Sequence, residues 1–228
     1  MEPFLQKYTL TVYWVVLVLD CIFLYFDLPY VAVTSSLLVP LLLLYLFIKD
    51  ANIGRPTGKF FFYIGLFLAF LGDVLQIAVK NEVFFFSSLI IFMLMNLCYS
   101  ICFFSLNKLG LRKPFPVLAT VAMLSVTGYV FVRIMGEEMG EYLIPVIVYM
   151  ITLIVMVALA INVAANPQYY TVAIRYFLPG SLVFILQNAI FAFNLFGLEG
   201  NASGFIYSVI PYAIGQYLMA KGILKVYL

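Results

Sequence analysis

The sequence predicts an all-α polytopic membrane protein, and three observations support this fold class. The chain has 228 residues, of which 66% are hydrophobic and 10% are charged, whereas an average soluble domain is about half apolar and a quarter charged. The apolar residues form successive runs of about 20 residues, the length of a helix that crosses a bilayer. The connections between these runs are short, so we predict a single integral membrane domain over residues 1–228.

Charged residues, Gly and Pro divide the chain into eight predicted transmembrane helices. The first apolar run starts at Tyr8 and is full span length, without the short apolar core and cleavage site of a signal peptide, so we interpret it as a retained helix. The clearest turn is 52–58, which contains Gly54, Pro56 and Gly58. The predicted spans are 8–26, 30–48, 59–79, 84–106, 115–135, 142–162, 171–196 and 204–224.

The distribution of Lys and Arg predicts the orientation of these helices. If the N-terminus lies in the cytoplasm, the inner segments carry ten basic residues, and the outer segments carry two, Lys80 and Arg133. Short cytoplasmic loops are enriched in Lys and Arg in membrane proteins. We therefore predict a multi-pass protein with both termini in the cytoplasm, which in a bacterial cell would lie in the inner membrane.

Several function classes are excluded by composition. The chain contains no His, which excludes His-based metal sites, Ser-His-Asp triads and His proton relays. Cys21, Cys98 and Cys102 lie in apolar runs without disulfide-framework spacing, so we interpret them as small packing residues. The net charge of +2 is too small to indicate a nucleic-acid partner. We predict no cofactor and no metal site.

Asp73 carries the most functional information because it lies inside the apolar third span. A carboxylate within a bilayer costs roughly 2.5–3.5 kcal/mol on insertion scales, and such residues generally serve binding, proton transfer or catalysis. The alternative is a hydrogen bond to a neighbouring helix that stabilises the bundle. No Lys or Arg occurs at a comparable depth in any predicted span. Burial therefore favours the neutral acid, which can act as a general acid or hydrogen-bond donor.

Other polar residues within the spans are predicted to form a pocket with Asp73. Asp73 and Gln76 are three residues apart and therefore share a helix face. Asp20 is a second carboxylate, at a depth similar to that of Asp73. Each Asn or Gln taken alone could instead form an interhelical hydrogen bond. A polar pocket ringed by apolar side chains is the usual form of a small-ligand site. The predicted pocket residues besides Asp73 are Asp20, Gln76, Asn96, Tyr99, Gln187, Asn188 and Gln216.

The spacing of polar residues also favours a parallel internal repeat of four helices. Gly65 precedes Asp73 by eight residues in the third span, and Gly180 precedes Asn188 by eight in the seventh. An offset of four helices gives both halves the same orientation, with the repeat axis along the membrane normal. Asp73 and Asn188 would then face one central cavity. The predicted halves are residues 1–110 and 111–228.

A series of short motifs in a fixed order resembles the YhhN family of lysoplasmalogenases, which are eight-helix membrane proteins. The most specific motif is Phe-Leu-Gly-Asp-Val-Leu at 70–75 in the third span. The further matching positions are Phe92, Asn96, Tyr99, Pro145, Tyr149, Gly180, Phe184, Asn188, Tyr212 and Gln216. The resemblance covers nearly the whole chain, and the order and spacing of these positions carry it.

The resemblance implies hydrolysis of the vinyl-ether bond of lysoplasmalogens, which releases a fatty aldehyde and a glycerophospho-head group. The expected partner is a lysolipid or another amphiphile. Two buried carboxyls suit this chemistry, because one protonates the vinyl carbon and the other takes a proton from the attacking water. The resemblance assigns the general acid to Asp73. Asn188, preceded by Gln187, stands where the family has an Asp preceded by Ser, and Asn96 stands where the family commonly has His. Asp20 is the candidate for the missing second carboxyl.

Three classes of function are compatible with the sequence. The first is an ether hydrolase of lysoplasmalogenase type with Asp73 as the acid. The second is a non-catalytic lipid-binding relative, because the amide of Asn188 cannot take a proton as a carboxylate does. The third is a small transporter, because parallel repeats around a polar site at mid-membrane also suit transport.

Overall fold

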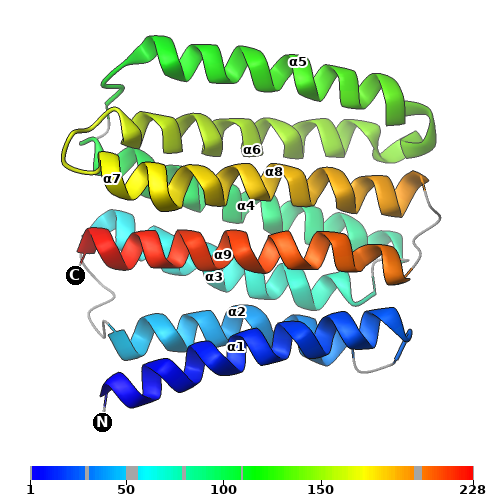
Figure 1. Cartoon of the computed structure of the whole chain (residues 1–228). Coiled ribbons are helices and arrows are strands. Elements are labelled where there is room, and N and C mark those ends of the chain that lie inside the picture. The colour runs from blue at the N-terminus through cyan, green and yellow to red at the C-terminus, as the bar shows by residue number, and fades with distance from the viewer. Residues whose placement is uncertain are drawn as a thin grey trace.

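Long helices make up most of the described chain, and no strand occurs in that part of it. The computed structural model describes residues 2–28, 31–49, 56–78, 81–108, 110–197 and 202–227, with the backbone alone described at 2–7, 31–33 and 202–203. The long helices lie side by side as a bundle (Figure 1). They are α1 (Glu2–Tyr25), α2 (Val31–Lys49), α3 (Thr57–Gln76), α4 (Glu82–Leu106), α5 (Pro114–Met139), α6 (Leu143–Ala164), α8 (Leu178–Ala192) and α9 (Ile206–Tyr227).

Short helical segments connect or extend the long ones. The 3₁₀ turn η1 (Gly140–Tyr142) joins α5 to α6, and a second 3₁₀ turn, η4 (Ala202–Phe205), precedes α9. The short helix α7 (Tyr170–Val172) and the π-helical segment η2 (Ala173–Phe177) precede α8, and a second π-helical segment, η3 (Phe193–Gly197), follows it. The predicted seventh span, 171–196, is therefore helical throughout and includes two π-helical stretches, at residues 173–177 and 193–196.

The apolar character of the helices confirms a polytopic membrane protein. Five segments of the described chain are long and apolar enough to cross a membrane: Tyr8–Tyr25, Thr57–Gln76, Glu82–Leu106, Pro114–Ala164 and Tyr170–Gly197. The fourth segment contains both α5 and α6, and Thr34–Lys49 of α2 is a shorter apolar helix. The count of eight spans and their orientation stay predictions.

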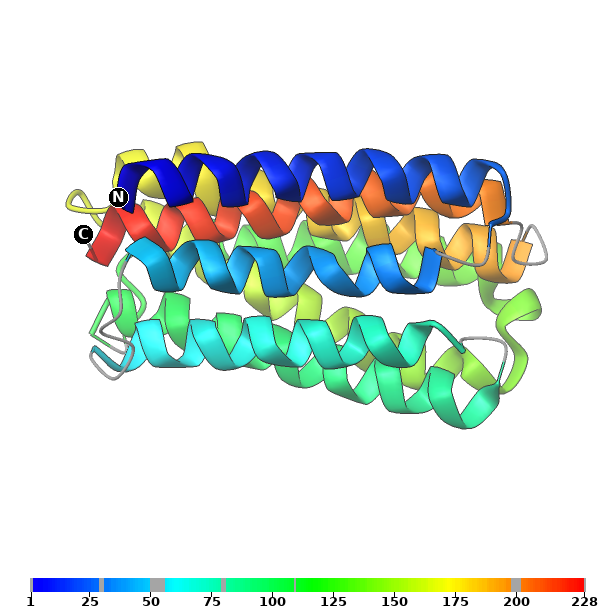
Figure 2. The same ribbon diagram turned by 90° about the horizontal axis from the view of Figure 1, so that it is seen from below.

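The bundle has two distinct ends. The N-terminal and C-terminal ends of the chain lie at one end (Figure 2). We call the opposite end, where α1 and α3 finish and α2, α4 and α9 begin, the far end. Because α3 ends at Gln76, Asp73 lies one turn from the far end of its helix. The predicted span 59–79 placed Asp73 deeper, but residues 77–78 form a turn.

Glycines allow two helix pairs to pack closely. A Cβ added at Gly72 of α3 would lie 2.6 Å from the ring of Phe92 on α4. A Cβ added at Gly215 of α9 would lie 2.9 Å from the ring of Phe184 on α8. Small residues at helix contacts let neighbouring backbones approach within a membrane. The first of these contacts sets the position of Asp73, which directly follows Gly72.

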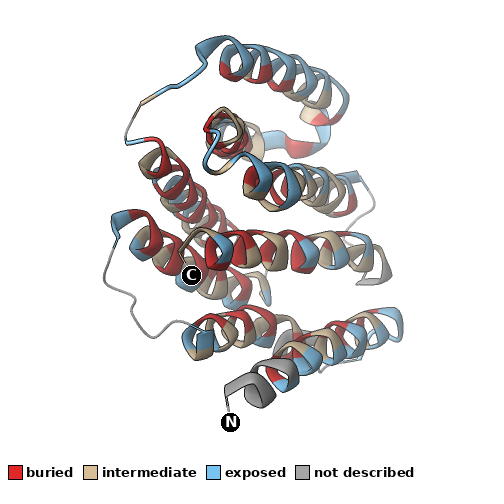
Figure 3. Ribbon diagram, turned by 60° about the vertical axis from the view of Figure 1, so that its left-hand side comes forward, coloured by how far each residue is buried: buried red, intermediate tan, exposed pale blue. Residues whose placement is uncertain are grey.

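The helix pairings recur at an offset of four long helices. Helix α1 packs on α2 as α5 packs on α6, and α3 packs on α4 as α8 packs on α9. The pairing of α4 with α6 likewise corresponds to the pairing of α9 with α2. A parallel repeat would produce this pattern, although the repeat and its halves stay a prediction. Helix α5 lies at the edge of the bundle and is exposed over most of its surface (Figure 3).

Candidate functional site

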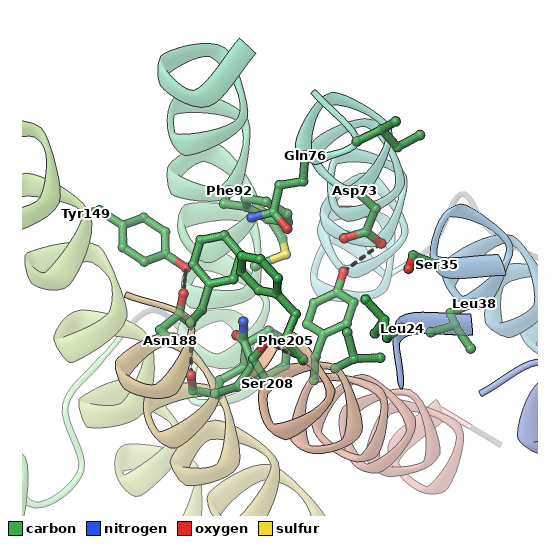
Figure 4. Close-up of a pocket in the computed structure, with 17 residues that line it drawn as sticks. Leu24, Ser35, Leu38, Asp73, Gln76, Phe92, Tyr149, Asn188, Phe205 and Ser208 are labelled. Carbon is green, nitrogen blue, oxygen red and sulfur yellow. Dashed lines mark hydrogen bonds between the residues drawn. The ribbon is translucent and has the colours of Figure 1, made fainter. Parts of the chain in front are cut away.

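A cavity of about 320 Å³ lies among the helices (Figure 4). It lies toward the far end of the bundle, because its lining includes Leu24 near the end of α1 and Ser35 near the start of α2. Its described lining comes from α1, α2, α3, α4, α6, α8, η4 and α9, together with Ile77 in the turn after α3. Polar groups line a mainly apolar chamber: Ser35, Asp73, Gln76, Tyr149, Gln187, Asn188, Ser208 and Tyr212. None of the described lining residues is Lys or Arg. The cavity therefore combines one carboxyl group with neutral hydrogen-bonding groups.

Asp73 is held on one side of the cavity by a tyrosine. The hydroxyl of Tyr212 on α9 donates to Asp73 Oδ2 at 2.9 Å, and the Asp73 side chain is 8% exposed. This bond joins α3 to α9. It is the kind of interhelical hydrogen bond expected if Asp73 only stabilises the bundle. The carboxyl also borders the cavity, which a purely structural hydrogen bond does not require.

Asn188 lies on the other side of the cavity and also accepts from a tyrosine. The hydroxyl of Tyr149 on α6 donates to Asn188 Oδ1 at 2.7 Å. Asn188 Nδ2 donates in turn to the backbone oxygen of Phe184 at 2.8 Å. These two bonds fix the orientation of the amide, with its oxygen toward α6. The neighbouring residue Gln187 lines the same cavity.

Three predicted pocket residues lie beneath the cavity wall and are not part of its described lining. The Tyr99 hydroxyl donates to Gln216 Oε1 at 2.8 Å, and Gln216 Nε2 lies 3.8 Å from the sulfur of Met95, which does line the cavity. Asn96 Nδ2 donates to Thr152 Oγ1 at 3.3 Å. Among the described residues, no group donates to the buried Oδ1 of Asn96.

Asp20 also lies behind the lining, where it contacts a residue that reaches the cavity. The Asp20 carboxyl on α1 is fully buried and accepts from Thr34 Oγ1 at 2.5 Å. Ser35 Oγ lies 2.9 Å from each Asp20 oxygen, and Ser35 lines the cavity close to Asp73 (Figure 4). Asp20 can therefore act on the cavity through the Ser35 hydroxyl.

The structure thus brings Asp73, Gln76, Gln187 and Asn188 together, as the sequence predicts, and adds two serines that sequence reasoning missed. Ser35 belongs to a run of three hydroxyl residues, 34–36, within an apolar span, and this run could have indicated it. Nothing comparable marks Ser208. Within the described part of the chain, no three His, Cys, Asp or Glu side chains gather as metal ligands. The catalytic and binding roles of the lining residues stay predictions.

The fold and cavity define the protein as a helical integral membrane protein with a cavity among its helices that contains a carboxyl group. A sequence model of the YhhN family matches residues 31–223, most of the chain, and the protein belongs to this family. No curated protein and no solved structure matches the chain. The matched range includes Asp73, Tyr149, Asn188 and Tyr212, whereas Asp20 on α1 lies before it.

Proposed function

We propose that this protein is a membrane-embedded hydrolase of lysoplasmalogenase type, which cleaves the vinyl-ether bond of lysoplasmalogen-type lysolipids. The observation that carries the proposal is the position of Asp73, a carboxyl on the wall of a cavity of about 320 Å³ in a YhhN-family protein. A cavity of this size lies within the range of small-ligand sites, roughly 300–1,000 Å³. The absence of Lys and Arg from its described lining favours a neutral acid at Asp73.

In the proposed reaction, Asp73 acts as the general acid. Its carboxylic acid transfers a proton to the vinyl carbon farther from the ether oxygen, which leaves a cation shared between the other carbon and that oxygen. Water adds to the cationic carbon, and the resulting hemiacetal separates into a fatty aldehyde and the head-group alcohol. The hydrogen bond from Tyr212 stabilises the Asp73 carboxylate that forms when the proton leaves.

The attacking water must lose a proton, and the Ser35–Asp20 pair offers an acceptor. Ser35 borders the cavity, and its hydroxyl donates to the Asp20 carboxyl. Water passes its proton to Ser35 Oγ while the Ser35 proton moves to Asp20. The proton then returns from Asp20 to Asp73 before the next turnover, so that each cycle consumes one water. Asn188 serves as an orienting group, because its amide oxygen is held by Tyr149 and it cannot act as a base.

A second candidate function is a lipid-binding relative without activity. The amide of Asn188 favours it, because the resemblance to the family expects a carboxyl at this position. In this case the cavity holds a lysolipid that is not hydrolysed. The two candidates share the ligand and differ in whether Asp73 transfers a proton.

Incubating the purified protein with a lysoplasmalogen and measuring fatty aldehyde separates the two candidates. We expect aldehyde release by the native protein, none above background by Asp73→Asn, and none from a saturated alkyl-ether lysolipid, which lacks the vinyl group. If the native protein releases no more aldehyde than Asp73→Asn, hydrolysis is rejected. A lysolipid that raises the Tm under those conditions would then support the lipid-binding relative.

We also propose that the chain crosses the membrane eight times, with both termini in the cytoplasm and the far end of the bundle outside. The lengths of the helices support this, since the 22 residues of α9 extend about 33 Å, enough to cross a bilayer. Single cysteines at Glu137, near the far end, and at Lys113, at the other end, test the orientation in a cysteine-free background. A membrane-impermeant maleimide applied to intact cells should label the first and spare the second; the reverse pattern would reject the orientation.

A further inference from the structure

A second cavity, of about 150 Å³, lies beside the first between α4, α5, α6 and α8. The two cavities share Gln76, Phe92, Tyr149, Asn188 and Phe191 in their linings, so they adjoin along these residues. Away from this boundary the second cavity is mainly apolar. Representative lining residues are Leu89, Leu124, Phe131, Val146, Leu153 and Ile185.

Helix α5 forms the outer wall of the second cavity. It packs chiefly along α6 and meets the end of α8 through the π-helical segment η3. The other face of α5 exposes large apolar side chains, including Val126, which is 63% exposed, and Ile134. In a membrane this face contacts lipid, so a single helix separates the cavity from the bilayer.

A glycine on α5 contributes to the wall of the second cavity. Gly128 lines the cavity, and a Cβ at this position would meet the flexible end of Met150, whose Cε lies 2.7 Å away. On the facing wall, Ala189 of α8 is the small residue next to Asn188. Larger side chains at either position would enter the cavity. Phe196 of η3 also lines it, and π-helical turns frequently occur at functional sites.

The chemistry of the two cavities matches an amphiphile with one hydrocarbon chain. A water molecule is not bound stably in an apolar cavity, because it needs hydrogen bonds to about two to four polar partners. A hydrocarbon chain loses little on moving from the bilayer into a cavity of similar polarity. The lining from Val146 to Ile154 on α6 extends about 12 Å along the helix. The cavity therefore suits the part of a chain next to its polar junction.

We propose that the second cavity is the binding subsite for the hydrocarbon chain of a single-chain amphiphile, which enters from the bilayer between α5 and the α8–η3 segment. The proposal rests on the proposed function in one respect: the polar junction of the same molecule lies in the first cavity beside Asp73. Gln76, Tyr149 and Asn188 lie at the boundary between chain and junction. The head group extends toward the far end of the bundle.

Photocrosslinking tests this subsite without requiring catalysis. The probe is a saturated alkyl-ether lysophosphocholine with a diazirine in its chain, which lacks the bond that Asp73 is proposed to cleave. Crosslinked residues in the full-length protein are located by mass spectrometry. We expect the label on the faces of α4, α5, α6 and α8 that line the second cavity. Labels confined to residues outside this lining would overturn the proposal.

Two variants that fill the subsite from opposite walls provide the matched comparison. Gly128→Phe and Ala189→Phe should each reduce crosslinking at least fivefold, whereas Val126→Phe, which places the same side chain on the lipid-facing surface of α5, should leave it unchanged. An equal yield in all three would overturn the proposal. If a filling variant does not fold, the label position in the native protein still decides the outcome.

The crosslinking experiment and the aldehyde assay with a lysoplasmalogen together distinguish failure of the subsite from failure of the proposed function. Crosslinking in the subsite without aldehyde release would support the subsite and reject hydrolysis. Aldehyde release with crosslinking elsewhere would support hydrolysis and reject the subsite.

Discussion

The Asp73–Tyr212 pair and the Asn188–Tyr149 pair resemble each other closely in geometry and differ in chemistry. In each pair a tyrosine hydroxyl donates to a polar residue that lines the first cavity, at 2.9 Å for Asp73 and 2.7 Å for Asn188. Only the first of these acceptors can exchange a proton. The hydrogen-bonding arrangement is therefore the same on both sides of the cavity, and of the two acceptors only the Asp73 carboxyl can exchange a proton.

The surroundings of the two pairs also differ. Asp73 lies close to Ser35, through which the buried Asp20 reaches the cavity. Asn188 lies at the boundary with the apolar second cavity. We therefore expect the Asp73 side to carry the chemistry and the Asn188 side to position the substrate.

The largest effect on the rate of aldehyde release is expected from Asp73→Asn. In this variant both tyrosines, Tyr212 and Tyr149, donate to an amide. Loss of a general acid removes roughly 10²–10⁴ in rate, so aldehyde release should fall to background. Asparagine can still accept from Tyr212, and neither the amide nor the neutral acid carries a charge, so the Tm should be retained. A variant that keeps full activity would show that Asp73 is not the acid.

The converse change, Asn188→Asp, places a carboxyl in both pairs. We expect the rate of aldehyde release to rise about tenfold or more, because a carboxyl in the cavity lining can take the proton of the water directly, whereas Asp20 takes it only through Ser35. The loss of the Asn188 Nδ2 bond to Phe184 should cost about 1 kcal/mol of stability. The measurement is the steady-state rate beside the Tm, with Gln187→Glu as a neighbouring control. A rate no higher than native would indicate that Asp20 already supplies the second carboxyl.

The Ser35→Ala variant tests directly whether Asp20 supplies the second carboxyl through the Ser35 hydroxyl. It should lower kcat about tenfold or more and leave KM nearly unchanged, because it interrupts proton transfer to Asp20 and leaves the rest of the cavity intact. Ser35→Thr keeps the hydroxyl and should restore most of the rate. Thr34→Val removes the other hydroxyl bonded to Asp20, which does not line the described cavity, and serves as the comparison. Equal losses in Ser35→Ala and Thr34→Val would indicate a structural role alone.

Removing each tyrosine hydroxyl should separate catalysis from stability. Tyr212→Phe leaves the Asp73 carboxyl without its donor and should reduce both the rate and the unfolding free energy, the latter by about 1–3 kcal/mol. Tyr149→Phe should reduce the unfolding free energy by a similar amount with a smaller effect on kcat. Measurements of kcat and chemical unfolding in detergent check both. If Tyr149→Phe lost more kcat than Tyr212→Phe, the Asn188 side rather than the Asp73 side would carry the chemistry.

The smallest effects on activity are expected from substitutions at the two glycine contacts, one beside Asp73 and one beside the helix that carries Asn188. Gly72→Ala introduces a Cβ 2.6 Å from the Phe92 ring, and Gly215→Ala introduces one 2.9 Å from the Phe184 ring. Overpacking of this kind typically costs about 1–3 kcal/mol, and the tighter contact at Gly72 should lower the Tm more. Gly136→Ala, whose nearest neighbour would be 3.7 Å away, is the control. If Gly72→Ala and Gly136→Ala have equal Tm values, the close approach of α3 and α4 does not depend on Gly72.

The sequence alone determined the membrane class, the approximate helices and the presence of the Asp73 carboxyl within an apolar helix. Each depends on local properties: the length of an apolar run, the residues that interrupt it, and the free energy of a carboxylate inside a bilayer. The family positions Tyr149, Asn188 and Tyr212 were also accessible, because order and spacing along the chain identify them.

The tertiary structure decided which polar groups meet. Tyr212 reaches Asp73 across 139 residues, and Ser35 stands between Asp20 and the cavity. Asn96, Tyr99 and Gln216, predicted in the lining, lie beneath it instead. The physical reason is that successive residues turn by about 100° around a helix. The face that meets the cavity therefore depends on helix rotation, which glycine contacts and π-helical turns set through packing between distant segments.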